Sequence, residues 1–333
     1  MAVRDEFGLT RRKAMMLGAV GGLAATATPG RAVSKTAPAG TFEILAEGLA
    51  FPEGPVAMPD GSVILVELTA GQVTRCWNGR TEVVSKVGGG PNGAQVGPDG
   101  ALYICNSGGV DPSNSHLADP SKPGRIERLD LDTGKVERLY DRVGDRPLSA
   151  PNDLVFDADG GIWFTDFGKV LEHGYGRGGV YYCRPDGSSI REIDYGASGY
   201  NGIGLSPDGK ALYFAMNHSA RLYRMTIEGA GEVTQDENGT GPKKEFVGVS
   251  SSGVEFDSLA VTRSGNVCIG TNFDGGITTI SLSGETSFMP LPEKMVTNIA
   301  FGGRDMRDAF LTWAVSGRLV RMRWSEPGLR LNF

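Results

Sequence analysis

A short motif recurs six times between residues 53 and 312, and this repeat restricts the fold more than any other feature of the chain. Each copy joins a polar residue, a short run of small or apolar residues, a turn and a second apolar run. Such a unit predicts two strands connected by a tight turn. The copies are EGPVAMPDGSVILVE from Glu53, NGAQVGPDGALYICN from Asn92, NDLVFDADGGIWFTD from Asn152, NGIGLSPDGKALYFA from Asn201, DSLAVTRSGNVCIGT from Asp257 and NIAFGGRDMRDAFLT from Asn298.

The turn glycine keeps the copies in register. In the first five copies the polar residue lies eight positions before it, and the sixth copy is the most degenerate. Successive copies begin 39, 60, 49, 56 and 41 residues apart, and almost no helical periodicity is found after residue 40. Repeats of this length that contain several strands each are typical of blades. We therefore predict an all-β chain whose residues 42–333 form a six-bladed β-propeller.

The polar residue that opens each copy carries a side-chain oxygen. The innermost strands of a propeller line a central channel, so a position repeated in every blade recurs around the axis at one height. The repeat thus predicts a ring of oxygen-bearing side chains, although any single member could instead be an ordinary turn residue. Its members are Glu53, Asn92, Asn152, Asn201, Asp257 and Asn298.

Carboxylate and amide oxygens suit a hard divalent cation, and the ring contains no thiolate or imidazole. Glu53 and Asp257 would offset the charge, and the amides would complete the ligand shell without adding repulsion. Calcium, which takes roughly six to eight oxygen ligands, fits best, with Zn²⁺, Mn²⁺ and Mg²⁺ as alternatives. Such a cation can act as a Lewis acid on a carbonyl or phosphoryl oxygen.

These motifs resemble the gluconolactonase, senescence-marker-protein and luciferin-regenerating-enzyme family of six-bladed propellers. The resemblance rests on FPEGP, PNDLVFDADGGIWFTDFG, NGIGLSPDGKALYFA, FDSLAV and TNIAFGG, in this order, and extends from about residue 42 to 331. It implies hydrolysis of lactones or, in some relatives, of organophosphates. It further implies that a metal is held by Glu53, Asn152, Asn201 and Asp257, that Asp153 supports these ligands, and that Asp257 is the general base.

Other positions are candidates for substrate binding or limit the resemblance. Asn92 and Asn298 could contact substrate rather than metal, and His116 lies in a long loop where a lid would be, or is simply solvated. Members that act on sugar lactones carry an arginine two residues before the third-blade asparagine, where this chain has Ala150. A lactone less polar than an aldonolactone is therefore an open alternative as the small-molecule substrate.

Two further functions remain open at this stage. The same cation could serve the hydrolysis of a phosphoester or organophosphate. The chain could also be a non-catalytic binding propeller in which calcium has a structural role. A catalytic cation keeps an open coordination position, whereas a structural one is closed.

The first 32 residues predict an export signal. Arg11 and Arg12 precede an apolar run from Ala14 to Ala27, and small residues follow near a cleavage site. The paired arginines indicate the twin-arginine export machinery as a partner of the precursor, and residues 33–41 read as a linker. The apolar run is shorter than the ~20 residues that span a bilayer. We expect a periplasmic or secreted protein that has no membrane contact after signal removal.

Charge and cysteines exclude further classes of partner and cofactor. The 33 basic and 39 acidic residues give a net charge of −6, which argues against nucleic acid as a partner. The four cysteines show no metal-binding spacing, and their spacing predicts no disulfide pairing. Cys105, Cys183 and Cys268 lie in apolar runs and are expected to be buried as small hydrophobic residues.

Overall fold

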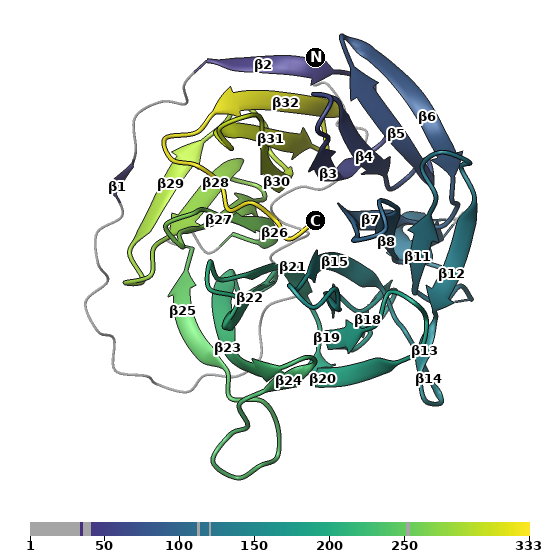
Figure 1. The fold of residues 1–333 in the computed structure, drawn as a ribbon, viewed down its shortest axis with the longest axis vertical. Coiled ribbons are helices and arrows are strands. Elements are labelled where there is room, and N and C mark those ends of the chain that lie inside the picture. Colours follow the sequence, from purple (N-terminus) through teal and green to yellow (C-terminus); the bar gives the residue numbers. More distant parts are fainter. Residues whose placement is uncertain (1–33, 36–40, 112–113, 120, 251–253) are drawn as a thin grey trace. The chain divides into compact units, whose positions relative to one another are not determined.

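The computed structural model describes residues 34–35, 41–111, 114–119, 121–250 and 254–333, which belong to one compact unit. The described residues form strands and no helix, and their main sheets are arranged as six blades around a centre (Figure 1). The predicted all-β, six-bladed β-propeller is confirmed. The predicted export signal, residues 1–32, and most of the linker lie outside the described residues and stay predictions.

Each blade is an antiparallel sheet of four main strands, and the innermost strand carries one member of the polar ring. The first three blades contain β3 (Pro52–Ala57), β4 (Val63–Glu67), β5 (Gln72–Trp77) and β6 (Arg80–Lys86); β7 (Pro91–Val96), β8 (Leu102–Asn106), β11 (Arg125–Leu129) and β12 (Val136–Tyr140); and β15 (Pro151–Phe156), β16 (Ile162–Asp166), β19 (Gly178–Cys183) and β20 (Ile190–Ala197).

The last three blades follow the same plan. They contain β21 (Tyr200–Leu205), β22 (Ala211–Met216), β23 (Arg221–Gly229) and β25 (Glu245–Val249); β26 (Phe256–Val261), β27 (Val267–Thr271), β28 (Gly276–Ile280) and β29 (Thr286–Pro290); and β30 (Val296–Gly302), β31 (Asp308–Trp313), β32 (Arg318–Arg323) and β2 (Phe42–Ala46). The sixth blade therefore combines both ends of the propeller chain, because β2 pairs with β32. This pairing closes the circle.

Short strands decorate the blades. One of them, β1 (Ser34–Lys35), pairs in parallel with β29, and β24 (Glu232–Val233) pairs with β23. The others form small hairpins: β9 (Val110–Asp111) with β10 (Asn114–Ala118), β13 (Arg142–Val143) with β14 (Arg146–Pro147), and β17 (Val170–Leu171) with β18 (Gly174–Tyr175).

The hydrophobic core is divided into six clusters, one at each contact between neighbouring blades. β16 shows how one strand serves two clusters. Ile162 and Phe164 pack against blade two, whereas Trp163 packs against blade four. Both faces of each sheet are thus buried, which explains why the second strand of every repeat is apolar at consecutive positions rather than at alternate ones.

The turn between the first two strands of each blade confirms the register of the repeat. The five turn glycines have φ between +69° and +92°, a region that favours glycine. In the degenerate sixth copy, Met306 occupies the same position and has a φ of +58°. The sixth turn therefore keeps the left-handed conformation without the residue that adopts it most easily.

The left-handed conformation of these turns should make the free energy of unfolding sensitive to replacement of a turn glycine. Gly100 has a φ of +77°, and no atom lies within 4 Å of the place where a Cβ would stand. Gly100→Ala should therefore lower the free energy of unfolding by about 1 kcal/mol through backbone strain alone. Denaturant unfolding measures this change. Gly100→Asn is the matched control and should lose less, since Asn tolerates this conformation; an alanine variant as stable as the parent protein would contradict the argument.

Candidate functional site

The six ring positions lie at irregularities in the innermost strands. In every blade the pairing between the first and second strands shifts register next to the ring residue, for example between Pro151 and Leu154 in β15. Such β-bulges re-aim side chains. In a regular strand Asn152 and Asp153 would point to opposite faces; in the bulged strand both side chains are buried.

Glycines next to three ring residues let the innermost strands approach closely. A Cβ on Gly54 would lie 2.5 Å from the carbonyl oxygen of Asn92, and one on Gly93 would lie 2.6 Å from that of Asn152. A Cβ on Gly202 would lie 2.8 Å from the carbonyl oxygen of Asp257. Each of these glycines faces the ring residue of the next blade, so the ring positions of blades one to three lie side by side, as do those of blades four and five.

The innermost strands form a closed circle in the order β3, β7, β15, β21, β26 and β30, with β30 beside β3 (Figure 1). Five ring members have exposed fractions between 2% and 8%, and Asn92 is half-buried. Two of them are in direct contact, because Asn298 Nδ2 donates to Glu53 Oε2 at 3.3 Å. The structure thus brings together the ring residues that the sequence predicts, without assigning their roles.

Three of the ring amides have an oxygen that is left unpaired. The Oδ1 atoms of Asn92, Asn152 and Asn201 are buried and accept no hydrogen bond. A buried polar atom without a partner is costly and calls for an explanation. Together with the carboxylates of Glu53 and Asp257, these oxygens form a donor set that fits a hard divalent cation.

The donor set contains few carboxylates. Among the residues that the structure describes, no group of three or more His, Cys, Asp or Glu side chains is arranged so that it could hold a metal. A cation at the ring would accordingly depend on amide oxygens for much of its shell.

Burial dominates the electrostatics of the ring. It raises the pKa of Asp153 and that of Asp257 to about 7 each, and it raises the pKa of Glu53 well above its ordinary value. The neighbouring charge of Asp257 raises the pKa of Glu53 and that of Asp153 further. Amide contacts from Asn272 to Asp257 and from Asn298 to Glu53 oppose this effect. The carboxylates therefore repel one another in a dry environment, which a bound cation would relieve.

A cavity of about 1650 Å³ extends along the channel from the ring to the turns between the first two strands. Asp153 and Asn298 line its ring end, and the C-terminal residues 329–333 line the other. There the chain end is fastened to blade three, because Asn332 Nδ2 donates to the Phe156 carbonyl at 2.8 Å and Phe333 stacks edge-on against Phe156. Figure 1 shows this terminal segment reaching the centre of the propeller. Residues 329–333, called the tail below, thus cover the end of the channel opposite the ring.

Three aromatic side chains from the loops of blades three and four pack against one another. The imidazole of His218 contacts the other two: its centroid lies 5.3 Å from that of the Phe167 side chain and 4.5 Å from that of the Tyr175 side chain. The backbone of Phe167 is fixed to that of Ala150 by an N–H···O bond of 2.9 Å. Ala150, where sugar-lactone relatives are expected to carry arginine, is therefore next to an aromatic cluster. The side chain of His116 lies outside the described part of the structure.

A second set of buried polar residues, which was not predicted from the sequence, lies at or just after the end of the second strand in five blades. Most of them hold the backbone that leads into the ring: Asp166 accepts from the N–H groups of Ser149 and Ala150 at 2.7 Å each. Each is the first Asn, Asp or Glu after the apolar run of its repeat, a signal that could have found them. They are Glu67, Asn106, Asp166, Asn217 and Asn272.

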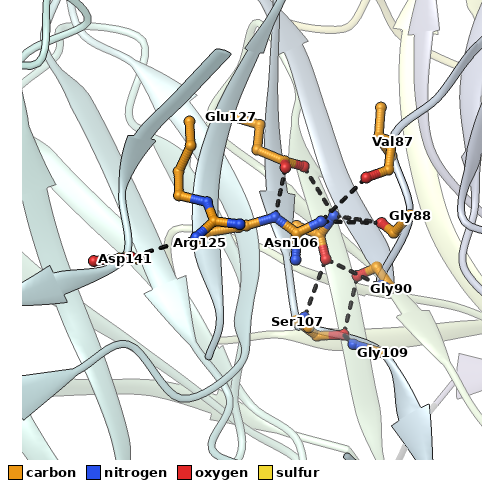
Figure 2. A network of polar contacts seen from close by, with 11 residues as sticks. Val87, Gly88, Gly90, Asn106, Ser107, Gly109, Arg125, Glu127 and Asp141 are labelled. Carbon is orange, nitrogen blue, oxygen red and sulfur yellow. Dashed lines mark hydrogen bonds and ion pairs between the residues drawn. The ribbon is translucent and has the colours of Figure 1, made fainter. Parts of the chain in front are cut away.

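Figure 2 shows the arrangement around the second-blade member of this set. The amide of Asn106 donates to the Gly88 carbonyl at 2.8 Å and accepts from the Gly90 N–H at 3.0 Å. It also donates to Glu127, which forms a buried ion pair with Arg125. This network fixes the loop that precedes Asn92 and explains how the ring residue is held in place.

The four cysteines lie inside the propeller. All four are buried and unpaired: Cys76, Cys105, Cys183 and Cys268. The burial expected for Cys105, Cys183 and Cys268 is therefore confirmed. Over the described ranges, we find no helix long and apolar enough to span a bilayer.

Comparisons with known proteins give consistent matches. The family model described as "SMP-30/Gluconolactonase/LRE-like region" matches residues 51–315. A gluconolactonase of Zymomonas mobilis is 25% identical over 315 residues, covering 86% of this chain and 82% of that protein. Lactonase drp35 of Staphylococcus epidermidis is 32% identical over 180 residues, 52% of this chain and 50% of the relative. The match thus spans about half the length of that lactonase.

Among solved structures, a calcium-binding protein, regucalcin, of Agrobacterium tumefaciens superposes with a TM-score of 0.70 at 18% identity. The superposition covers 90% of this chain and all of the other. At this level of identity the likeness supports the propeller fold alone.

Proposed function

The chain belongs to the SMP-30/gluconolactonase/LRE-like family, and from this premise we propose that it is a metal-dependent hydrolase that opens a lactone ring. The observation that carries the proposal is the set of unpaired oxygens of Asn92, Asn152 and Asn201 beside two buried carboxylates. A divalent cation accounts for both the missing hydrogen bonds and the mutual repulsion of the carboxylates. Relatives named as lactonase and gluconolactonase support the reaction.

Glu53, Asn152, Asn201 and Asp257 would hold the cation, and calcium suits them best because amides and carboxylates are hard oxygen ligands. When bound, the cation would polarise the lactone carbonyl and stabilise the charge that develops on its oxygen. Asp153 lies beside the ring, with one oxygen accepting from the Leu154 N–H at 2.9 Å. It would keep the bulged strand in shape and orient the ligand that precedes it.

Asp257 would take the proton from the attacking water. Its carboxylate is buried, and its pKa is raised by burial to about 7 in the cation-free protein. A bound cation would lower this pKa, so Asp257 would be ionised at the ring and able to accept a proton. Asn92 and Asn298 remain candidates for contacts with the substrate, as does His116 of the long second-blade loop.

The surroundings of the ring favour a lactone that carries an apolar substituent over a polyhydroxylated one. The side chain of Ala150 offers no donor to a sugar hydroxyl. Phe167, whose backbone is bonded to that of Ala150, forms an aromatic cluster with Tyr175 and His218. The tail covers the opposite end of the channel, so we expect substrate to arrive from the ring end.

The mature protein should be tested against a panel of aldonolactones, aliphatic lactones and aromatic lactones. Each is measured after chelation and after addition of Ca²⁺, Mn²⁺, Zn²⁺ or Mg²⁺. We expect hydrolysis that disappears with chelator and returns with at least one cation, with aldonolactones as the poorer substrates. Absence of turnover on every lactone with every cation would refute the proposed function.

Two alternatives have distinct outcomes when phosphotriesters are added to this panel. Cation-dependent cleavage of phosphotriesters without lactone turnover would indicate an organophosphate hydrolase at the same ring. Tight cation binding without any turnover would indicate a binding propeller in which the cation has a structural role.

We further propose that the precursor is exported through the twin-arginine pathway, so that the protein acts in the periplasm or outside the cell. Replacing both Arg11 and Arg12 with lysine should leave the precursor in the cytoplasm, because this signal is recognised by its receptor as an address. Cell fractionation and immunoblotting measure the distribution. Undiminished export of the double variant would contradict the twin-arginine assignment, though not export by another route.

A further inference from the structure

Asn272 differs from the other buried polar residues that follow the second strands. Its counterparts Glu67, Asn106 and Asp166 bind the backbone of the loop that precedes the ring in their own blade. Asn272 instead directs its side chain to a ring carboxylate: Nδ2 donates to Asp257 Oδ2 at 2.7 Å. The backbone N–H of Asn272 meanwhile donates to the Glu255 carbonyl at 3.0 Å. Both contacts are therefore made to residues 255–257, the segment that ends at Asp257.

The side chain of Asn272 is poorly explained by stability alone. It is 2% exposed, and its Oδ1 atom is buried and accepts no hydrogen bond. An apolar residue of the same size would avoid the unmet acceptor but would leave the buried Asp257 carboxylate without this donor, so what the amide supplies is its bond to Asp257. The bond that it does make is charge-assisted and fixes the orientation of the Asp257 carboxylate.

We propose that Asn272 is the positioning residue of the site: it holds Asp257 in the one rotamer that serves both cation and substrate. This inference rests on the proposed function, since it assigns Asn272 to the group that would act as ligand and base. Without the amide donor, the carboxylate could rotate about its side-chain bonds in the bulged strand. Loss of a hydrogen bond that orients a metal ligand commonly costs about 10- to 100-fold in metal affinity or activity.

The test compares Asn272→Leu, which is near in size but has no donor, with Asn106→Leu. Asn106 occupies the equivalent position of blade two, is fully buried, and binds backbone rather than a ring side chain. For Asn272→Leu we expect kcat to fall by about 10- to 100-fold with KM within about twofold of the parent value. Cation affinity, measured by calorimetry without substrate, should weaken by a similar factor. Asn106→Leu should lower the melting temperature and should change kcat and cation affinity much less than Asn272→Leu, because Asn106 touches no ring carboxylate.

A second variant keeps the inference testable if leucine prevents folding. Asn272→Ser has a smaller side chain and supplies an O–H donor in place of the amide N–H, so it should fold and recover part of the lost kcat and cation affinity. Parent-like kcat and cation affinity in both Asn272 variants would overturn the inference, as would an equal loss in Asn106→Leu. If the unmodified protein neither binds a cation nor opens a lactone, the proposed function itself fails. The two failures are thus separable.

Discussion

Asp257→Asn should lower kcat by on the order of 10²–10⁴ even at saturating cation, the usual contribution of a positioned acid or base. The substitution is nearly isosteric and keeps one ligand oxygen, but it removes the negative charge and the basicity. If Asp257 were only a ligand, its replacement would weaken cation binding, and excess cation would restore most of the rate. A rate that stays low at saturation therefore separates proton transfer from ligation.

The measurement is a cation titration of turnover on the best lactone of the panel, with binding followed independently by calorimetry. Glu53→Gln is the matched control, because Glu53 is the other carboxylate of the ring and has no proposed role in proton transfer. It should lose cation affinity and regain most of its turnover when the cation is in excess. Full recovery of turnover by Asp257→Asn would remove Asp257 as the base while leaving the metal site intact.

The cation-free protein should become less stable as the pH rises from 5 to 8. Burial raises the folded-state pKa of Asp153 and that of Asp257 from 3.8 to about 7. Between these values the folded protein binds more protons than the unfolded chain, so stability falls by up to about 1.4 kcal/mol per pH unit for each group. Asp166, whose pKa burial raises to about 6, adds to the loss at the acid end of this range.

Carboxylates whose pKa is lowered should not mask this trend. Asp119 and Asp305 have pKa values lowered to about 2, chiefly by hydrogen bonds to their ionised forms. Their contribution to stability is lost only as the pH falls below about 4, outside the range of the experiment. A saturating cation should restore the melting temperature at pH 8 much more than at pH 5, because it binds the folded protein and the ionised ring.

Thermal melts at pH 5 and pH 8, with chelator and with calcium, test this prediction. Asp153→Asn serves as the control, since it removes one of the two groups and should flatten the pH dependence of the chelated protein. A melting temperature that rises between pH 5 and pH 8 in the presence of chelator would contradict the electrostatic description of the ring.

The repeat determined most of the fold. In the first five copies the ring residue lies eight positions before the turn glycine, and this spacing predicted their hairpins. In the degenerate sixth copy, the structure places Met306 at the same position with a similar φ. Local chemistry was sufficient here because a tight turn needs a left-handed residue and a strand buried on both faces needs a continuous apolar run. The family resemblance carried the same register across nearly the whole propeller.

What only the tertiary structure decided lies at the ring itself. Strand periodicity would place Asn152 and Asp153 on opposite faces, whereas in the structure the register shift of β15 falls at these two residues and re-aims their side chains. Likewise, no spacing in the sequence distinguishes Asn272, which binds Asp257, from Asn106, which binds backbone. The reason is physical: these side chains find their partners across blade contacts and along strands of different registers, so their hydrogen bonds depend on how the closed circle of six blades brings the innermost strands together.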